Sequence, residues 1–349
     1  MKIAICCRKG SFSDYWLTYC EENGISYKKV DAYQSDIMKQ IEDCDAFMWH
    51  FSHLDYKDKV FAKQLLYSIE ASGKPVFPNF KTVWHFDDKL GQKYLFESIK
   101  APLVTSYAFY TKQEALLWAN KASFPKVFKL RGGAGSTNVR LVDTRKEAVS
   151  LISRAFSRGF SAYDPLASLK DRWRDYRSGK CPFFVLLKSF FRLFIVSSAI
   201  KLLPLEKGYV YFQDFIPNND TDTRIVVIGD KIIGERRGVR NGDFRASGSH
   251  ILLPDASKVD MRCVQLAYNV SKKLGLQIGV FDFVHDKDNP LLVEVSYGTD
   301  PDYTECEGYW NERLQFTSAP INLPKMIIES FIQNLSLIHI SEPTRQAEI

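Results

Sequence analysis

GVFDFVHDKDNPLLVEVS, residues 279–296, contains two apolar runs separated by the polar turn sequence HDKDNP. This pattern predicts an antiparallel hairpin. A hairpin centred on the turn places Asp282 opposite Glu294, and it also places Val284 opposite Leu292. Directly opposed residues share a face, with Cβ atoms about 5 Å apart. Two carboxylates so placed repel each other unless a cation lies between them, and Mg²⁺ is held by one or two carboxylates together with substrate phosphates.

Ser296 follows Glu294 by two residues and therefore points to the same face of the strand. The alternative to this arrangement is a register slipped by one residue. Such a slip turns every side chain to the other face and leaves one of the two carboxylates in solvent.

A glycine-rich loop, RGGAGST at residues 131–137, joins the strand-like runs VFKL and NVRLV. It is not a P-loop, because no GK[ST] sequence opens a helix after it. Gly132, Gly133 and Gly135 allow successive N–H groups to turn toward one point and form a nest for anionic oxygens. The alternative is an ordinary glycine-containing hairpin.

Two lysines accompany this loop. Lys129 lies in the apolar run VFKL, where a lysine costs desolvation energy unless it snorkels or finds an anion. The alternative is a lysine on the exposed face of the strand. Lys89, in FDDKL, is an ordinary helix-surface residue when it is considered alone.

A second hairpin is predicted in TDTRIVVIGDKIIGERR, where the Gly-Asp dipeptide suits a two-residue turn. This register pairs Arg224 with Glu235 and Asp222 with Arg237. One interpretation is a ladder of cross-strand ion pairs that stabilises the sheet. The other is a polar floor that holds ribose and phosphate, extended by FRASGS at residues 244–249.

Residues 1–80 alternate between strand and helix patterns. KIAICC, SYKKVDA, DAFMWHF and PVFPN are strand-like, whereas SDYWLTYCEENG, SDIMKQIEDC (capped by Ser35) and DYKDKVFAKQLLYSIEASG are helix-like. This alternation predicts a parallel sheet. Gly10 and Ser11 follow the first strand without a GxGxxG sequence, so we expect a Rossmann-like shape without dinucleotide chemistry.

The composition is that of a soluble globular protein with two or three domains, since 45% of the 349 residues are hydrophobic and 25% are charged. The seven cysteines are scattered and include no CxxC pair. This argues against a disulfide framework and against a zinc site, and it fits reduced thiols in a cytoplasm. The apolar run before Arg8 is too short for a signal peptide.

The basic charge is concentrated in one segment. Residues 170–201 contain eight basic and two acidic residues, which accounts for the whole net charge of +6. The segment lies in an insertion, residues 163–208, that also contains the aromatic run PFFVLLKSFFRLFIV. Lys188 and Arg192 interrupt this run and argue against a membrane span, because each is costly at the centre of a bilayer. Two interpretations remain: a helical pair docked on the core with a solvated basic face, or peripheral contact with the anionic inner face of a membrane. We expect no nucleic-acid partner, because no recognisable nucleic-acid-binding module is present.

Six motifs in this order resemble the ATP-grasp superfamily, and most closely its ligase branch of ribosomal-protein glutamate ligases and glutathione synthetase. The motifs are FDDKL, VFKLRGGAGSTNV, YFQDFIP, DTRIVVIGDK, NGDFRAS, and GVFDF with LLVEVS. The resemblance covers about residues 80–300. It implies an α/β N-terminal domain with a Rossmann-like parallel sheet, followed by an α+β ATP-grasp fold with antiparallel sheets.

The motifs and the composition also divide the chain. We expect a Rossmann-like pre-ATP-grasp domain at residues 1–80, a small ATP-grasp subdomain with the glycine loop at 81–160, a basic aromatic helical insertion at 161–208 and a C-terminal subdomain with the metal site at 209–335. The last fourteen residues, SLIHISEPTRQAEI at 336–349, resemble translated vector or adapter sequence, so we expect a non-native tail there.

The resemblance implies a role for each matching residue. The residues expected to contact ATP are Lys89, Lys129, Gly132, Gly133, Gly135, Ser136, Gln213, Asp214, Phe215, Ile216 and Asp222. The residues expected to face the transferred phosphate and the acyl group are Arg237 and Arg245, and those expected to hold Mg²⁺ are Asp282, Glu294 and Ser296.

The implied activity is that of an ATP- and Mg²⁺-dependent carboxylate–amine ligase that works through an acyl phosphate. The chain has Ser296 where the family usually has Asn, and Asp214 where the hinge usually has Glu. The first departure favours an alternative function, a catalytically weakened ATP-binding protein of the same fold with a regulatory or scaffold role.

The phrase EVSYGTDPDYTECEGYW resembles a bacterial branch of ligases found among surface-polysaccharide genes. This resemblance implies a polysaccharide-precursor or other small-molecule carboxylate, or an amino acid, and an amine acceptor. We expect a cytoplasmic enzyme, and we expect it to form a homodimer, the commonest assembly of soluble enzymes. His85, His250 and His285 are interpreted as incidental, because no orienting partner for a catalytic histidine is identified.

Overall fold

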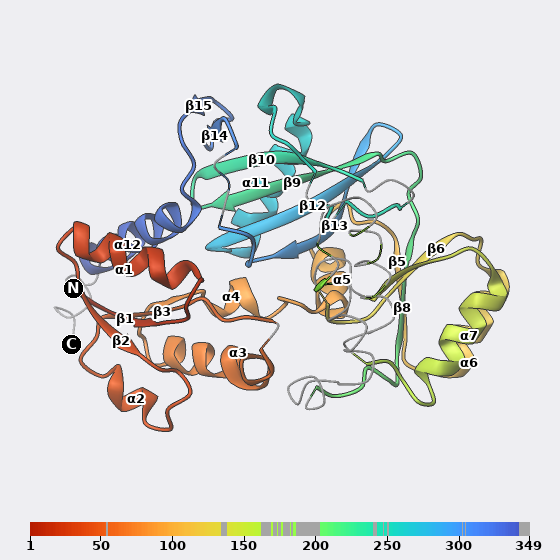
Figure 1. Ribbon diagram of the computed structural model, residues 1–349, viewed down its shortest axis with the longest axis horizontal. Helices are drawn as coiled ribbons and strands as arrows, with labels where there is room; N and C mark the ends of the chain where they lie inside the picture. Colours follow the sequence, from red (N-terminus) through yellow and green to blue (C-terminus); the bar gives the residue numbers. More distant parts are fainter. Residues whose placement is uncertain are drawn as a thin grey trace.

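In the computed structural model, three β-sheets are arranged side by side along the long axis of the molecule (Figure 1). The structure describes residues 1–53, 55–133, 138–161, 203–239, 243–246, 248–249, 251–301, 303 and 305–341, together with residues 169, 173, 176, 182, 184 and 185. The predictions for the basic insertion therefore lie almost wholly outside the described residues, as do those for Gly135 and Ser136.

The first sheet is parallel, with the strand order β2-β1-β3-β4, as the alternating pattern predicts. Its strands are β1 (Lys2–Cys6), β2 (Ser26–Val30), β3 (Ala46–Trp49) and β4 (Val76–Phe77). Its helices are α1 (Phe12–Glu22), α2 (Ile37–Gln40) and α3 (Tyr56–Ala71). The apolar residues of β1 and β3 are buried on both faces of the sheet, which is typical of a parallel sheet covered by helices.

One predicted helix is much shorter than its sequence pattern. Only Ile37–Gln40 are helical, and the N-cap is Asp36, without a side-chain cap bond, instead of the expected Ser35. So short a segment gains little from helix formation itself. Its apolar side chains Ile37 and Ile41 are nevertheless buried in the core. Turns can bury these two side chains as well as a longer helix can. The burial of the side chains, and not helix propensity, therefore determines the conformation of this segment.

The C-terminal helix α12 (Leu323–Ser341) packs against α1 of the N-terminal sheet (Figure 1). The indole Nε1 of Trp16 donates a hydrogen bond to the Pro324 carbonyl oxygen at 3.1 Å. Ile327 and Leu335 are buried in the same core as Ile3 and Trp16. The end of the described chain thus completes the core with which the chain begins.

The largest sheet is formed by antiparallel strands in the order β13-β12-β9-β10-β14-β15, with β11 on β10. Its strands are β9 (Thr221–Ile228), β10 (Lys231–Gly238), β11 (Leu252–Leu253), β12 (Ile278–Asp286), β13 (Asn289–Ser296), β14 (Gly308–Trp310) and β15 (Phe316–Ser318). Helix α11 (Met261–Leu274) and a short 3₁₀ helix (Ala256–Lys258) cover one face.

The third sheet has the order β5-β8-β6-β7 and is also antiparallel. Its strands are β5 (Ser106–Phe109), β6 (Lys126–Lys129), β7 (Val139–Val142) and β8 (Val210–Asp214), covered by α6 (Lys112–Lys121) and α7 (Arg145–Ala155). Helices α4 (Phe80–Val83) and α5 (Lys89–Ser98) connect the parallel sheet to this part. The predicted fold class is therefore confirmed.

The hairpin of β12 and β13 corrects one detail of the predicted register. Asp282 pairs with Glu294 as predicted, but Leu292 pairs with Phe283 and not with Val284. The turn has two central residues, because Asp286 pairs with Asn289, and a bulge between Asp282 and Phe283 then shifts the register by one residue. The bulge restores the pairing of the two carboxylates that a two-residue turn alone would have offset.

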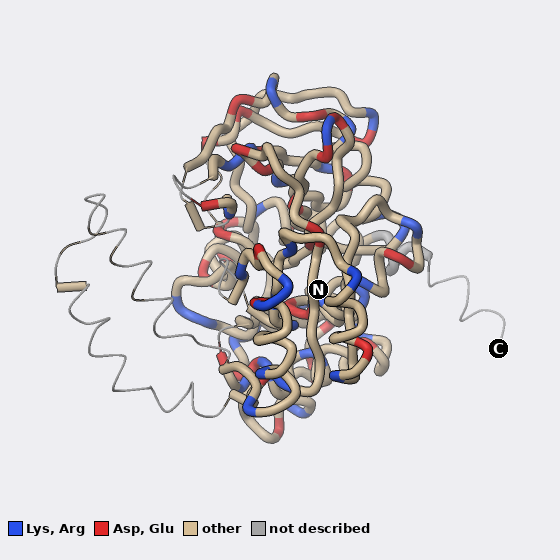
Figure 2. The backbone as a smooth tube through the Cα atoms, turned by 90° about the vertical axis from the view of Figure 1, so that its right-hand side faces the viewer, with Lys and Arg blue, Asp and Glu red and all other residues tan. Residues whose placement is uncertain are grey.

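Basic and acidic residues are interspersed along the described backbone (Figure 2). Among the described residues, no helix is both long enough and apolar enough to cross a bilayer.

Candidate active site

A cavity of about 670 Å³ lies between the third sheet and the largest sheet. This volume is within the usual range for small-molecule and cofactor sites. Lys89, Lys129, Asp282 and Glu294 all line the cavity. The structure therefore brings together side chains from α5, β6, β12 and β13 that are as far as 205 residues apart in the sequence.

Asp282 is a buried carboxylate of the cavity wall, with 7% of its surface exposed. Its Oδ1 accepts a hydrogen bond from Arg224 Nε at 2.8 Å, and its Oδ2 lies 2.9 Å from the Nη2 atoms of both Arg224 and Arg237. Burial by itself would raise the pKa of Asp282, but the two guanidinium groups outweigh it and hold the pKa well below its usual value. Asp282 is therefore ionised at neutral pH.

Glu294 faces Lys89 across the cavity. The Lys89 ammonium lies 3.7 Å from Glu294 Oε2 and donates a hydrogen bond to the Gly133 carbonyl oxygen at 2.9 Å. Lys89 is the first residue of α5, where Asp88 caps the helix by accepting a hydrogen bond from the Gly91 backbone N–H. Although Lys89 looks like a surface residue in the sequence, only 8% of it is exposed.

Lys129 lies on the buried face of β6, with 7% of its surface exposed. Its ammonium donates a hydrogen bond to Gln213 Oε1 at 2.6 Å. Burial lowers the pKa of Lys129 from 10.5 to about 8. The lysine is still mainly charged at neutral pH, and it is held inside the cavity instead of on the exposed face of the strand.

The hinge predicted to meet adenine also lines the cavity. Gln213, Asp214, Phe215 and Ile216 form its wall at the end of β8. Asp214 accepts a hydrogen bond from Lys126 at 2.6 Å, and the Phe215 ring packs edge-on against Phe244 at 5.8 Å. These contacts hold the hinge beside a second wall formed by residues 243–246.

The first two glycines of the loop are anchored by a residue that the sequence analysis did not identify. Asp87 accepts a hydrogen bond from the Gly133 backbone N–H at 2.6 Å, and it forms an ion pair with Lys59 at 3.1 Å. A Cβ atom on Gly132 would lie 3.0 Å from the Asp87 carboxylate, and Gly133 has φ = 128°, a conformation that other residues rarely adopt. FDDKL therefore supplies a loop anchor as well as a lysine.

The predicted pairing of Asp222 with Arg237 is confirmed, both in the strand register and as an ion pair. Arg237 Nε donates to Asp222 Oδ1 at 2.8 Å. Burial raises the pKa of Asp222 above its usual value, although Arg237 opposes the shift. Arg237 lies on β10 behind Asp222 and Asp282, whereas the two aspartates face the cavity.

Arg224 and Glu235 stand opposite each other in the strand register, as predicted. Arg224 forms its ion pair with Asp282, however, instead of with Glu235. Arg224 also stands opposite Asp282 on the neighbouring strand β12 and bonds to that carboxylate. Burial raises the pKa of Glu235 to about 7 in spite of the nearby arginines. A ladder of cross-strand ion pairs thus exists, but it runs from β10 through β9 to β12.

Of the two remaining predicted site residues, Arg245 lies at the cavity and Ser296 does not. Arg245 lines the cavity and donates to Asp243 at 2.6 Å through Nη2. Ser296 is not part of the cavity lining; its hydroxyl donates to the Gly298 carbonyl oxygen at 2.8 Å and accepts from the Gly298 N–H at 3.1 Å. This local turn keeps the hydroxyl on its own backbone.

The donor chemistry of the two acidic residues fits Mg²⁺, because both offer carboxylate oxygens to one cavity. Glu294 retains a partly exposed side chain, whereas Asp282 must give up part of its arginine contacts to bind an ion. The two carboxylates are therefore compatible with a shared cation, whereas Ser296 lies outside the cavity lining.

Comparison with known proteins identifies the fold. The D-alanine–D-alanine ligase from Bacillus anthracis, complexed with ATP, superposes with a TM-score of 0.58 at 12% identity over 96% of this chain and 98% of that one. The RimK domain protein ATP-grasp from Sphaerobacter thermophilus has a TM-score of 0.53 at 15% identity over 87% of this chain and 93% of that one.

Sequence comparison gives a narrower match. Residues 196–309 match the family model described as the RimK-like ATP-grasp domain. A probable alpha-L-glutamate ligase from Xanthomonas oryzae pv. oryzae is 30% identical over 89 residues, which are 24% of this chain and 29% of that protein. The matched part thus spans about three-tenths of the length of this curated relative.

The fold defines the class: the chain has the ATP-grasp fold, and one of the solved structures that share this fold is complexed with ATP. Within that class, it resembles the RimK-like branch through residues 196–309. The resemblance stated from the six motifs is therefore confirmed for the fold and for this domain.

Proposed function

We propose that the chain is an ATP- and Mg²⁺-dependent ligase that joins a carboxylate to an amine through an acyl phosphate. The observation that carries this proposal is the convergence of Lys89, Lys129, Asp282 and Glu294 on one cavity of about 670 Å³. The solved ATP-grasp ligases of similar fold, one of them complexed with ATP, support the same conclusion.

In this mechanism the cavity first binds ATP. We assign adenine binding to the hinge, residues 213–216, and a hydrogen bond from a ribose hydroxyl to Asp222, because all of these residues line the cavity. Lys89 and Lys129 supply positive charge to the phosphates from buried, fixed positions, where electrostatic stabilisation is strong. Mg²⁺ held by Asp282 and Glu294 would neutralise charge on the β- and γ-phosphates.

A carboxylate oxygen of the substrate then attacks the γ-phosphorus, ADP leaves, and the acyl phosphate forms. The amine attacks the acyl carbon, its proton passes to solvent, and phosphate leaves as the amide bond forms. Because an acyl phosphate hydrolyses in water, this step requires that water be kept from the cavity. Gly133, held by Asp87 at the start of the glycine loop, lines the cavity. Arg245 lines the same cavity and is proposed to face the transferred phosphoryl group.

The test is ADP release by the purified chain with a panel of amino acids, peptides and uronic-acid sugars as substrates. We expect one carboxylate and amine pair to stimulate ADP formation, and Lys89→Met to reduce turnover by about 10²–10³-fold. Lys93→Met is the matched control on the same helix, because Lys93 pairs with Glu97 at 2.7 Å and is not part of the cavity lining. Equal turnover in the two variants would contradict the proposal.

The alternative function is a catalytically weakened ATP-binding protein. It is favoured by the two arginines that already bind Asp282, and by the hydroxyl of Ser296, which stays on its own backbone. Binding of ATP without ADP release for any substrate pair would select this alternative. For the ligase, we propose a polysaccharide-precursor or amino-acid carboxylate as substrate, on the basis of the EVSYGTDPDYTECEGYW resemblance.

A further inference from the structure

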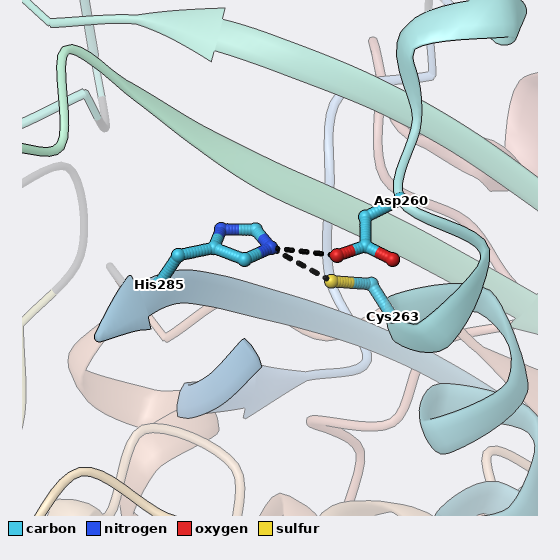
Figure 3. A group of neighbouring side chains, drawn as sticks. All are labelled: Asp260, Cys263 and His285. Carbon is cyan, nitrogen blue, oxygen red and sulfur yellow. Dashed lines mark hydrogen bonds and ion pairs between the residues drawn. The ribbon is translucent and has the colours of Figure 1, made fainter. Parts of the chain in front are cut away.

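A second group of ligating side chains lies on the other face of the largest sheet. Val284 of β12 lines the cavity, and the next residue, His285, therefore points to the opposite face, where α11 packs. Figure 3 shows the His285 ring directed toward Asp260 and Cys263, which lie at the first turn of α11. These three residues have no part in the proposed ATP site.

The three donor atoms are close together. His285 Nε2 lies 3.0 Å from Asp260 Oδ2 and 3.8 Å from Cys263 Sγ, and all three atoms lie within 4.8 Å of one another. A tetrahedral zinc ion, with bonds of about 2.0–2.3 Å, separates its nitrogen, oxygen and sulfur ligands by roughly 3.3–3.6 Å. The observed separations from His285 lie close to this range on either side, so a small adjustment of side chains suffices.

We propose that Asp260, Cys263 and His285 bind one zinc ion, or a similar transition-metal ion, with water as the fourth ligand. A thiolate and an imidazole select such an ion over Mg²⁺, which prefers oxygen ligands. The site is thus chemically distinct from the one proposed at Asp282 and Glu294. Metal binding here would replace the thiol proton of Cys263, which passes to solvent.

The surroundings hold the donors in place. Asp260 is the N-cap of α11 and accepts a hydrogen bond from the Arg262 backbone N–H at 2.9 Å through Oδ1. Its Oδ2 lies 3.0 Å from His285 Nε2 and also accepts a hydrogen bond from Arg262 Nη2 at 2.7 Å. The exposed Arg262 guanidinium also bonds this carboxylate, and such outer contacts commonly orient metal ligands. The Asn219 side-chain amide holds the His285 backbone. Its Oδ1 accepts a hydrogen bond from the His285 N–H at 2.8 Å, and its Nδ2 donates one to the His285 carbonyl oxygen at 3.0 Å.

Access and burial are also suited to a metal. Cys263 is fully buried, and burial raises the pKa of its thiol to about 12, so the thiol stays neutral unless a cation comes close. The side chains of Asp260 and His285 are 20% and 25% exposed, which leaves a route for an ion and for a water ligand. The composition argued against a zinc site because it lacks CxxC pairs. The fold instead joins a DxxC sequence, residues 260–263, to a histidine on a neighbouring strand.

The test is titration of the purified, chelator-treated full chain with Co²⁺ and then with Zn²⁺. We expect one equivalent of Co²⁺ to produce a thiolate-to-cobalt charge-transfer absorption, which Zn²⁺ removes and a large excess of Mg²⁺ does not. His285→Gln should weaken binding by more than about 100-fold, and this partly exposed position tolerates the change without loss of folding. Cys263→Ser should abolish the charge-transfer band altogether.

The matched control is Cys7→Ser, which removes an exposed thiol that lies outside the cluster. It should leave the band and the stoichiometry unchanged. The proposal is overturned if no stoichiometric binding occurs, if the band survives in folded Cys263→Ser or His285→Gln, or if the band is lost in Cys7→Ser.

Discussion

Replacement of Lys129 by methionine should increase the stability of the protein while it weakens ATP binding. Lys129 is buried in β6, with its ammonium 2.6 Å from Gln213 Oε1. Burial lowers the pKa of this lysine from 10.5 to about 8. Methionine has a similar length and no charge, so the variant removes the buried charge with little change in packing.

The magnitude follows from the pKa difference. Each pKa unit corresponds to 1.36 kcal/mol, so the charged lysine costs the folded state about 3 kcal/mol. The variant leaves Gln213 Oε1 without its donor, at a cost of about 1–2 kcal/mol. The expected net gain in the free energy of unfolding is therefore about 1–2 kcal/mol at pH 7.

This gain has a defined pH dependence. Below pH 8 the lysine is charged in both the folded and the unfolded chain, so the penalty is fully present. Between pH 8 and 10.5 the unfolded chain binds a proton that the folded chain has lost, so the stability of the wild-type protein rises with pH. The advantage of Lys129→Met should therefore shrink across this window and disappear above it.

The assay is denaturant unfolding of both proteins at a series of pH values, together with ATP titration at pH 7. We expect ATP affinity to fall by about tenfold or more, because a charge-assisted contact with a phosphate is lost. Lys126→Met on the same strand is the control; it removes the partner of Asp214 and should bring no gain in stability. Destabilisation by Lys129→Met at pH 7, or a gain that does not change with pH, would refute the argument.

Three further results are expected. Asp282→Asn and Glu294→Gln should each reduce ADP release by about 10²-fold or more. Only Asp282→Asn should also lower the free energy of unfolding, by about 3–5 kcal/mol in a denaturant melt, because it leaves two buried guanidinium groups without their full counter-charge. Equal losses of stability in the two variants would contradict this difference. Gly133→Ala should raise the KM for ATP and cost about 1 kcal/mol, because φ is 128° at this position; an unchanged KM would show that the loop conformation is unimportant. Trp16→Phe should cost about 1–2 kcal/mol by calorimetry, through loss of the hydrogen bond to Pro324; no loss would mean that this contact does not help to hold α12.

The parallel sheet and the two hairpins were predictable from the sequence because each depends on local patterns. Strand and helix periodicities alternate over the first 80 residues, and the Gly-Asp dipeptide fixes the turn between β9 and β10. The early end of α2 was not predictable from the sequence. The apolar spacing of SDIMKQIEDC suits a helix, and nothing in that spacing shows that the helix ends at Gln40.

The pairing of Asp282 with Glu294 was predicted correctly, although the register near the turn was wrong. The predicted hairpin was centred on Asp288, whereas the real turn is one residue tighter and a bulge at Val293 compensates. A sequence shows no direct sign of such a bulge, since it depends on how the strand fits its neighbours. The prediction was right for the two carboxylates because the tighter turn and the bulge each shift the register by one residue, in opposite directions.

The partners of Arg224 could not be inferred from the hairpin alone. Within the hairpin, Arg224 stands opposite Glu235, but the strand on its other side is β12, which is more than 50 residues away in the sequence. Arg224 bonds Asp282 of that strand. Asp87 was missed for a similar reason, because its hydrogen bond to Gly133 depends on how α5 and the glycine loop meet.

The arrangement of charge in the cavity explains why the two sheets have to be held at a fixed separation. The carboxylates come from the largest sheet and are backed by arginines of β9 and β10, whereas the lysines come from β6 and the start of α5. Lys89 connects the two sides, since its ammonium bonds the Gly133 carbonyl oxygen and lies 3.7 Å from Glu294. A movement that carried Gly133 away from Glu294 would break one of these two contacts. A nucleotide phosphate that replaced Glu294 as the partner of Lys89 would free that carboxylate for a metal ion at the moment when the phosphate needs one.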